Sequence, residues 1–231
     1  MSTNAYVIPA LTPTTLPVAG SNTRFPVSRI FCVGRNYAEH AREMGHDSDK
    51  APPFFFMKPS TSLVADGAAM KYPAMTTDLH HEVEMVVALA HGGVNVSPDN
   101  APDLVYGYAV GLDMTRRDLQ GEAKRLGRPW ETGKAFDNSA PCSELQPAER
   151  IGHPAEGLIE LHVNGEVRQT GNLNEMIWNV PETIAYLSTL FTLLPGDLIF
   201  TGTPAGVGAV GRGDQLQASI AHVGELSVVI E

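Results

Sequence analysis

The chain is divided into many short apolar runs bounded by turn-forming residues, and this pattern constrains the fold more than any other feature. The Asn164-Gly165 pair between two such runs is the strongest short-range signal of a β-hairpin. The few predicted helices do not alternate with the strands, which argues against a doubly wound α/β fold. We therefore expect an α+β, mostly β fold: a mixed β-roll or barrel with a few short helices. Strands are predicted at residues 29–33, 54–57, 82–89, 105–113, 158–163, 166–169, 198–201, 216–220 and 226–230.

Three helices are predicted between these strands. Asn36 followed by Glu39 forms a capping-box pattern, and this first helix is expected to end near Gly45. The polar stretch 115–125 predicts a second helix. A third is predicted at 179–192, because Asn179 is followed by Pro181 in the first turn and by Glu182 three residues on.

The length of the chain sets its domain organisation. Its 231 residues, 43% of them hydrophobic, suffice for one large globular domain. Residues 1–28 are rich in Pro, Thr and Ala and have little periodicity. We expect them to form an extended N-terminal arm, followed by a single domain at residues 29–231.

Charge and cysteine content limit the partners and the compartment. The formal net charge of −10 argues against nucleic acid and anionic membranes as partners. No apolar stretch approaches the roughly 20 residues of a membrane-spanning helix, and no secretory signal is visible. Cys32 and Cys142 are far apart in the sequence, which fits a reducing compartment. The expected location is cytoplasmic.

Three acidic residues are the first candidates for chemistry. Glu82 and Glu84 are two apart in a predicted strand, so both side chains are expected on one face, and Asp113 ends another predicted strand. Three oxygen ligands without a nearby Cys favour Mg²⁺ or Mn²⁺ over Zn²⁺. Two exposed acids on an edge strand are the commoner explanation for the pair alone, so the surrounding motifs decide.

A histidine–glutamate pair and a glycine-rich loop are further candidates. His40 and Glu43 are neighbours on a predicted helix, where a carboxylate orients an imidazole as a general base, although a solvated helix face has the same pattern. Gly206, Gly208 and Gly211 satisfy the spacing G-x-G-x-x-G. We reject a dinucleotide site because a strand, not a helix, is predicted next.

Several polar residues stand at the ends of apolar or glycine-rich segments. Arg35, Lys58 and Lys134 are placed to bind a carboxylate or an oxyanion, although lysines at such positions are more often surface residues. Gln120 follows Asp113 by seven residues and would present an amide to the same pocket.

Taken together, these segments resemble the fumarylacetoacetate hydrolase family. The combination is specific although no single segment is, and it extends over about residues 29–231. The chain lacks the separate N-terminal domain of the long family members and so resembles the short, acylpyruvase-like branch. Within that branch, residues 42–59 look most like members that act on fumarylpyruvate in gentisate breakdown. The matching stretches, in the family's order, are 33–43, 56–60, 81–84, 111–115, 133–134, 163–166 and 196–208.

The resemblance implies a homodimer that binds Mg²⁺ or Mn²⁺ through Glu82, Glu84 and Asp113. It also implies metal-dependent hydrolysis of the C–C bond of a small acidic 2,4-dioxo acid. The expected substrate is 3-fumarylpyruvate, which is cleaved to fumarate and pyruvate.

The catalytic roles follow from the same resemblance. His40, oriented by Glu43, would activate the attacking water. Lys134, Gln120 and Thr203 would hold the oxyanion or the substrate carboxylate.

Other reactions remain open on the same residues. They are hydrolysis of acylpyruvates with small acyl groups, oxaloacetate decarboxylation, and isomerisation of a related dioxo acid. A non-catalytic metal-binding β-module is disfavoured, because a pure binder needs no oriented base. Four cations are available to bind a distal substrate carboxylate, and the sequence does not choose among Arg116, Arg117, Lys124 and Arg128.

Overall fold

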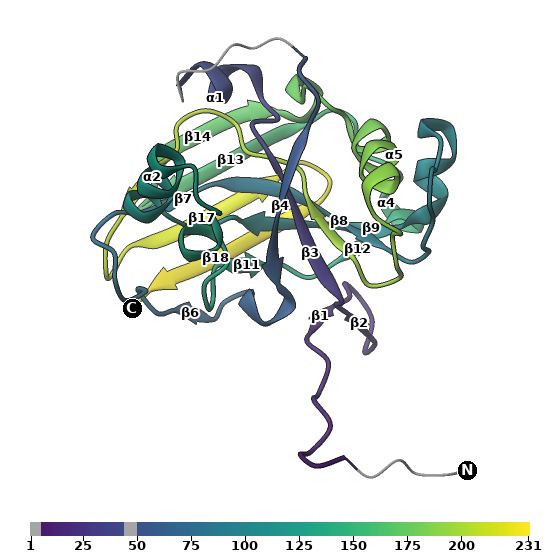
Figure 1. The fold of residues 1–231 in the computed structure, drawn as a ribbon, viewed down its shortest axis with the longest axis horizontal. Coiled ribbons are helices and arrows are strands. Elements are labelled where there is room, and N and C mark those ends of the chain that lie inside the picture. The colour runs from purple at the N-terminus through teal and green to yellow at the C-terminus, as the bar shows by residue number, and fades with distance from the viewer. Residues whose placement is uncertain (1–5, 44–49) are drawn as a thin grey trace.

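A curled, eight-stranded mixed sheet forms the centre of the molecule, and a five-stranded sheet packs against it (Figure 1). The computed structural model describes residues 6–43 and 50–231. The expected mostly-β α+β fold is confirmed. In spatial order the large sheet contains β4 (Phe54–Pro59), β3 (Arg29–Gly34), β15 (Leu198–Phe200), β8 (Val83–Leu89), β9 (Val105–Leu112), β11 (Ala140–Cys142) and β5 (Leu63–Ala65), with β12 (Gln146–Pro147) beside β9.

Two small sheets and several helices complete the part of the chain that the structure describes. The five-stranded sheet has the order β14 (Glu166–Asn172), β13 (Leu158–Val163), β17 (Gln215–Ile220), β18 (Gly224–Ile230) and β6 (Ala69–Met70). The small sheets are β10 (Thr115–Arg116), β7 (Leu79–His81) and β16 (Gly208–Val210), and the hairpin β1 (Thr15–Pro17) with β2 (Arg24–Pro26). The α-helices are α1 (Ala38–Glu43), α2 (Arg117–Leu126), α3 (Glu131–Lys134), α4 (Ala148–Ile151) and α5 (Val180–Leu190), and 3-10 turns cover Ser60–Ser62, Pro98–Leu104 and Leu173–Glu175.

Strand β8 lies between two hydrophobic cores, so all seven of its residues are buried. Val87 faces the five-stranded sheet and packs in the same cluster as Leu161 of β13. Val86 points the other way, into the curl of the large sheet, where it shares a cluster with Ile30 and Phe200. The two faces follow from the two-residue period of a strand, and the continuous apolar run of residues 85–89 follows from burial on both faces.

The same alternation places acidic side chains at one end of the curled sheet. Glu84 is on the face of Val86, and its partner in register on β9 is Gly111. A Cβ at position 111 would lie 2.5 Å from Val86 Cγ2, so glycine is required for close packing there. Asp113 follows Gly111 by two residues and therefore projects toward the same side as Glu84.

The predicted strand 82–89 differs from the structure at its first residue. Residues 79–89 form two strands. The first, β7, belongs to the small sheet with β10 and β16, whereas the second, β8, belongs to the large sheet. Glu82 lies at the break between the two strands. Glu82 and Glu84 nevertheless converge, because the main-chain nitrogen of Asp113 donates to the Glu82 carbonyl oxygen and so continues the pairing of β8 with β9.

The helix predictions were partly right. The capping box at Asn179 is present and opens α5. The capping box predicted at Asn36 is wrong, because its side chain accepts a hydrogen bond from the main-chain nitrogen of Trp178 (2.8 Å) and donates one to the carbonyl oxygen of Thr201 (2.7 Å). The predicted helix end at Gly45 lies outside the described residues. None of the described helices has the length and apolar character needed to cross a membrane.

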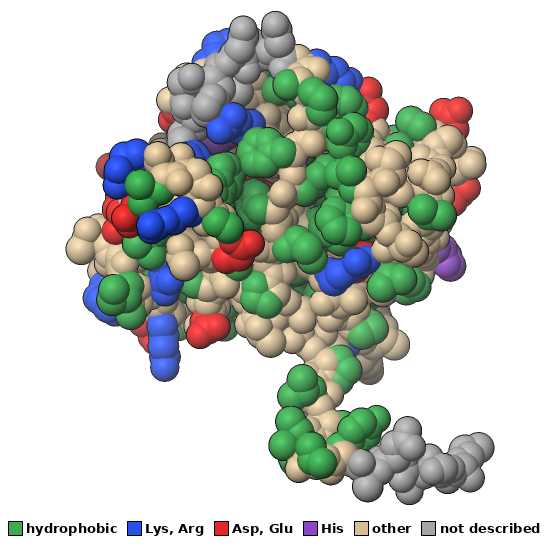
Figure 2. Space-filling view, viewed as in Figure 1, with side chains coloured by type: hydrophobic (Ala, Val, Ile, Leu, Met, Phe, Trp, Pro, Cys, Tyr) green, Lys and Arg blue, Asp and Glu red, His purple; other side chains and the backbone are tan. Residues whose placement is uncertain are grey.

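The N-terminal region contributes a hairpin to the body. Leu16 of β1 and Phe25 of β2 are buried in the core of the curled sheet. Residues 6–13 are exposed and extend away from it (Figure 2).

Candidate active site

Three buried carboxylates meet at the end of the curled sheet. Oxygen atoms of Glu82, Glu84 and Asp113 all lie within 4.8 Å of one another. The residues are only 5%, 2% and 0% exposed. Pairing continues past the ends of β8 and β9, since the Asp113 main-chain nitrogen donates to the Glu82 carbonyl oxygen at 2.8 Å. This pairing brings together acids that are 29 or more positions apart along the chain.

Three cations surround this cluster. Lys134 Nζ donates to Glu82 Oε2 (2.7 Å) and to Asp113 Oδ2 (2.6 Å). Arg117 Nη2 lies 2.5 Å from Glu82 Oε1, and Lys58 Nζ lies 2.8 Å from Asp113 Oδ1. Because the three cations balance three acids, a bound divalent ion would leave the site positively charged, which favours an acidic ligand.

Glu84 differs from the other two acids in its partners. Its carboxylate accepts a hydrogen bond from the Gly202 main-chain nitrogen at 2.8 Å, and among the described residues it makes no ion pair. Burial and the nearby charges of Asp113 and Glu82 raise the pKa of Glu84 well above its usual value. Three hard oxygen donors, one of them lacking a cation, fit Mg²⁺ or Mn²⁺.

Glu82 shows the opposite shift. Burial alone would raise the pKa of Glu82, but the charges of Lys134 and Arg117 outweigh it and lower that pKa well below the usual range. Glu82 is therefore ionised at neutral pH without a metal.

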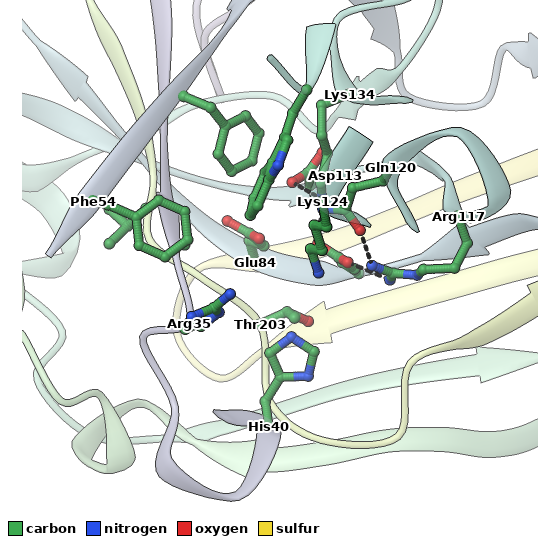
Figure 3. A pocket seen from close by; sticks show the side chains of 15 residues that line it. Arg35, His40, Phe54, Glu84, Asp113, Arg117, Gln120, Lys124, Lys134 and Thr203 are labelled. Atoms are coloured by element: carbon green, nitrogen blue, oxygen red, sulfur yellow. Dashed lines mark hydrogen bonds and ion pairs between the residues drawn. The ribbon is translucent and has the colours of Figure 1, made fainter. Parts of the chain in front are cut away.

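His40 of α1 lines the same pocket as the acids (Figure 3). His40 Nδ1 lies 3.2 Å from Glu43 Oε2, and His40 is 6% exposed. The Glu43 carboxylate also accepts a hydrogen bond from the main-chain nitrogen of Gly206 at 3.2 Å. The glycine-rich loop thus binds the Glu43 carboxylate of the chain itself. A carboxylate on Nδ1 holds the proton there and leaves Nε2 free to accept another.

The remaining predicted residues lie in the same pocket, which is lined by Arg35, Gln120, Lys134 and Thr203 together with the acids. Gln120 Oε1 accepts a hydrogen bond from Arg117 Nη1 at 2.7 Å, so its amide nitrogen is left for a ligand. Thr203 Oγ1 accepts one from Gln169 Nε2 at 2.7 Å and keeps its own proton to donate.

Lys58 lies outside the pocket, contrary to its expected place among the anion-binding cations. It is 1% exposed, and its ammonium contacts Asp113 and the main-chain oxygens of Met114 and Lys134. Lys58 therefore supports the acid cluster from behind and does not face the ligand.

Gln169 of β14 is a site residue that the sequence did not reveal. Its Oε1 accepts hydrogen bonds from Val83 N (3.0 Å) and His81 Nδ1 (2.9 Å), and its Nε2 donates to Thr203 Oγ1 and to the Pro204 carbonyl oxygen. It thereby joins the segment of the acids to the loop that carries Thr203. A Gln in a polar hairpin strand carries no local pattern that distinguishes it from a solvated residue.

The rejection of a dinucleotide site is supported, because the glycine-rich segment is followed by strands β16 and β17. The two cysteines are buried and unpaired.

Comparisons with known proteins agree with this geometry. The model of the fumarylacetoacetate (FAA) hydrolase C-terminal domain matches residues 29–231. The chain is 47% identical over 189 residues to fumarylpyruvate hydrolase from Ralstonia sp., covering 81% of this chain and 98% of that protein. It is 45% identical over 202 residues to the mitochondrial oxaloacetate tautomerase of Rattus norvegicus, covering 87% of this chain and 91% of that protein.

A solved structure is similar over nearly the whole chain. It is the crystal structure of fumarylpyruvate hydrolase from Pseudomonas aeruginosa in complex with Mn²⁺ and pyruvate, with a TM-score of 0.95 and 50% identity, covering 98% of this chain and 99% of that one. Since the family model, the fold and the relatives agree, the chain belongs to the fumarylacetoacetate hydrolase family.

Proposed function

We propose that this protein is a divalent-metal-dependent hydrolase that cleaves 3-fumarylpyruvate to fumarate and pyruvate. The observation that carries the proposal is the presence, in one pocket, of a buried three-carboxylate cluster and a histidine oriented by a carboxylate. The similarity to an enzyme whose crystal structure contains Mn²⁺ and pyruvate supports both the metal and the product end of the substrate.

Glu82, Glu84 and Asp113 would hold Mg²⁺ or Mn²⁺. The bound ion would act as a Lewis acid that stabilises negative charge developing on the pyruvate part of the substrate. His40 Nε2 accepts a proton from the water that adds to the C4 carbonyl, and Glu43 stabilises the resulting imidazolium. The C3–C4 bond then breaks, its electron pair stays with the pyruvate unit as an enolate, fumarate leaves, and the enolate carbon takes up the proton held by His40 to give pyruvate.

The other pocket residues bind the substrate. Lys134 and Gln120 would donate hydrogen bonds to the oxygens of the dioxo acid, and Thr203 would donate from its hydroxyl group. Lys134 already bridges two acids. Burial alone would lower the pKa of Lys134, but the charges of Asp113 and Glu82 outweigh it and raise that pKa, so Lys134 stays cationic.

A second candidate activity is tautomerisation of oxaloacetate. The rat relative at 45% identity has this activity in its name. The His40–Glu43 pair suits it as well, because tautomerisation needs a proton acceptor but no attacking water.

Pyruvate release from fumarylpyruvate, acetylpyruvate and oxaloacetate separates these reactions. Each substrate is assayed with Mn²⁺, with Mg²⁺ and with EDTA, and the enol–keto conversion of oxaloacetate is followed by ultraviolet absorbance. We expect the highest kcat/KM for fumarylpyruvate and loss of activity with EDTA. Faster turnover of oxaloacetate, or full activity with EDTA, contradicts the proposal.

We further propose a cytoplasmic homodimer that acts in gentisate breakdown. The unpaired thiols of Cys32 and Cys142 suit a reducing compartment. Figure 2 shows hydrophobic side chains gathered near β4 and the end of α5, where Met57 and Phe191 are 39% and 38% exposed, and an apolar surface of this kind suits a second copy. Light scattering after size-exclusion chromatography measures the mass of the protein in solution. A mass equal to that of a single chain contradicts the dimer.

A further inference from the structure

Among the residues that the structure describes, two cations of the pocket have no acidic partner. Arg35 at the end of β3 and Lys124 on α2 both line the pocket and are partly buried. Within residues 6–43 and 50–231, neither forms an ion pair or a side-chain hydrogen bond, and burial lowers the pKa of each. Of the acids nearby, Glu82 is paired with Lys134 and Glu43 with His40, and Glu84 accepts a hydrogen bond from the main-chain nitrogen of Gly202.

Aromatic rings support both cations. The Arg35 guanidinium carbon lies 5.3 Å from the ring centroid of Phe54, and Lys124 Nζ lies 5.0 Å from that of Trp130. The two rings are themselves in contact, edge to face, with centroids 5.4 Å apart. They form a continuous apolar wall that connects the two positive charges.

The backbone keeps Arg35 on the pocket side. Its φ angle is +58°, a left-handed conformation that few side chains other than Asn and Asp adopt. The next residue, Asn36, is fixed by hydrogen bonds to the main chain of Trp178 and Thr201. In Figure 3, Arg35 lies on the other side of Glu84 from Asp113, and the amine end of Lys124 points toward the space that Arg35, His40 and Thr203 surround.

Like charges meet at this end of the pocket. Burial, with the charges of Arg117 and Arg35, lowers the pKa of Lys124 to about 8. An anion placed between Arg35 and Lys124 would offset the repulsion between them and would accept hydrogen bonds from both.

We propose that Arg35 and Lys124 form a receptor for a second substrate carboxylate, distal to the one beside the acid cluster, and that they make the enzyme select acyl groups ending in a carboxylate. A flat, conjugated linker lies well along the wall of Phe54 and Trp130, whereas a small acyl group leaves both cations without a partner. The orientation of the substrate in this inference rests on the proposed function. Of the four cations that the sequence offered, Arg116 stacks on Phe136 outside the pocket, Arg117 is paired with Glu82, and Arg128 is exposed and does not line the pocket.

The kinetic test compares fumarylpyruvate with acetylpyruvate, which lacks the distal carboxylate. Wild type, Lys124→Met, Arg35→Met and Arg125→Met are assayed, the last being an exposed cation on the same helix as Lys124. The ratio of kcat/KM for fumarylpyruvate over acetylpyruvate should fall about 10- to 100-fold in the first two variants, as expected for a lost charge-assisted hydrogen bond. Arg125→Met should keep the wild-type ratio, and Lys124→Arg should restore most of it.

A binding test needs no turnover. Fumarate and crotonate differ only in that a methyl group replaces one carboxylate, and their binding to the Mn²⁺-loaded protein is measured by calorimetry. Wild type should prefer fumarate by about 10-fold or more, and Lys124→Met should lose the preference.

The outcomes distinguish the receptor from the proposed function. Unchanged kinetic ratios in Lys124→Met and Arg35→Met, or an unchanged preference for fumarate, overturn the receptor. Failure of wild type to cleave either substrate overturns the proposed function, and the calorimetric comparison still tests the receptor.

Discussion

The ammonium group of Lys58 lies 2.8 Å from Oδ1 of Asp113, and the two side chains are only 0% and 1% exposed. Lys58 also donates to Ser139 Oγ at 3.0 Å and contacts the carbonyl oxygens of Met114 and Lys134. A single buried cation from β4 therefore connects Asp113 to the segment that carries Lys134. The position of both groups therefore depends on a residue that does not line the pocket.

Replacing Lys58 should destabilise the metal-free protein strongly. Lys58→Met leaves part of the Asp113 charge uncompensated in the interior, which costs about 3–5 kcal/mol for a broken buried pair. Urea denaturation in EDTA measures the free energy of unfolding. Lys71→Met, which removes an exposed lysine, serves as the control and should change it by less than about 0.5 kcal/mol. Equal midpoints for the two variants would show that the pair contributes nothing.

Replacing His40 should remove turnover but not metal binding. His40→Ala eliminates the group that accepts the proton, so kcat should fall by about 10²–10⁴-fold. The Kd for Mn²⁺, measured by calorimetry, should stay within about threefold, because the carboxylates remain. Glu43→Gln should lower kcat less, since it keeps a hydrogen bond to Nδ1 but not the charge. A collapse of Mn²⁺ affinity in His40→Ala would identify His40 as a ligand.

Stability and metal binding should be linked through Glu84. Its pKa in the folded, metal-free protein is raised above the unfolded value of 4.5. The folded state therefore holds this proton more tightly, and its contribution to stability is present at low pH and lost as pH rises from 4.5 toward the raised pKa. Mn²⁺ replaces the proton, so the stabilisation that it provides should grow with pH over that window.

Thermal unfolding measures this linkage. At a fixed Mn²⁺ concentration of about 100 times the Kd at pH 7.5, the ion should stabilise the protein at pH 7.5 by about 2.7 kcal/mol, or roughly 5–10 °C in Tm, and the same concentration should give a smaller shift at pH 5. Glu84→Gln should lose most of the shift and its pH dependence. A shift that is equal at both pH values would rule out Glu84 as the titrating ligand.

Gln169 should affect KM through the loop that carries Thr203. Gln169→Glu keeps the size of the side chain but cannot donate to Thr203 Oγ1 or to the Pro204 carbonyl oxygen. Each lost partner costs about 1–3 kcal/mol when buried. We expect KM to rise at least 10-fold with a smaller change in kcat, measured with fumarylpyruvate. Conversely, an unchanged KM in a folded variant would separate Gln169 from substrate binding.

Most of the fold was predictable because the strands are marked locally. Alternating apolar residues mark β13 and the Asn164-Gly165 turn joins it to β14, and the continuous apolar run of residues 85–89 reflects burial on both faces of β8. The capping box at Asn179 was predictable for the same reason, because its hydrogen bonds join residues three apart.

The partners of long-range side chains were not predictable. The amide of Asn36 has the local context of a helix cap, yet it binds main-chain groups near residues 178 and 201. At Glu82 the chain passes from the small sheet of β7, β10 and β16 to the large sheet that contains β8. Both outcomes are decided by segments distant in sequence, which no local pattern records.

The sequence by itself determined which chemical groups this protein has, because residue types and their periods set the strands, the three carboxylates and the His40–Glu43 pair. Only the tertiary structure decided which charges meet. Lys134 bridges two acids and Lys58 is buried behind one of them, whereas Arg35 and Lys124 have no acidic partner within residues 6–43 and 50–231. The physical reason is that ion pairing depends on distances of a few ångströms between residues far apart along the chain, and these distances exist only once the sheets have packed.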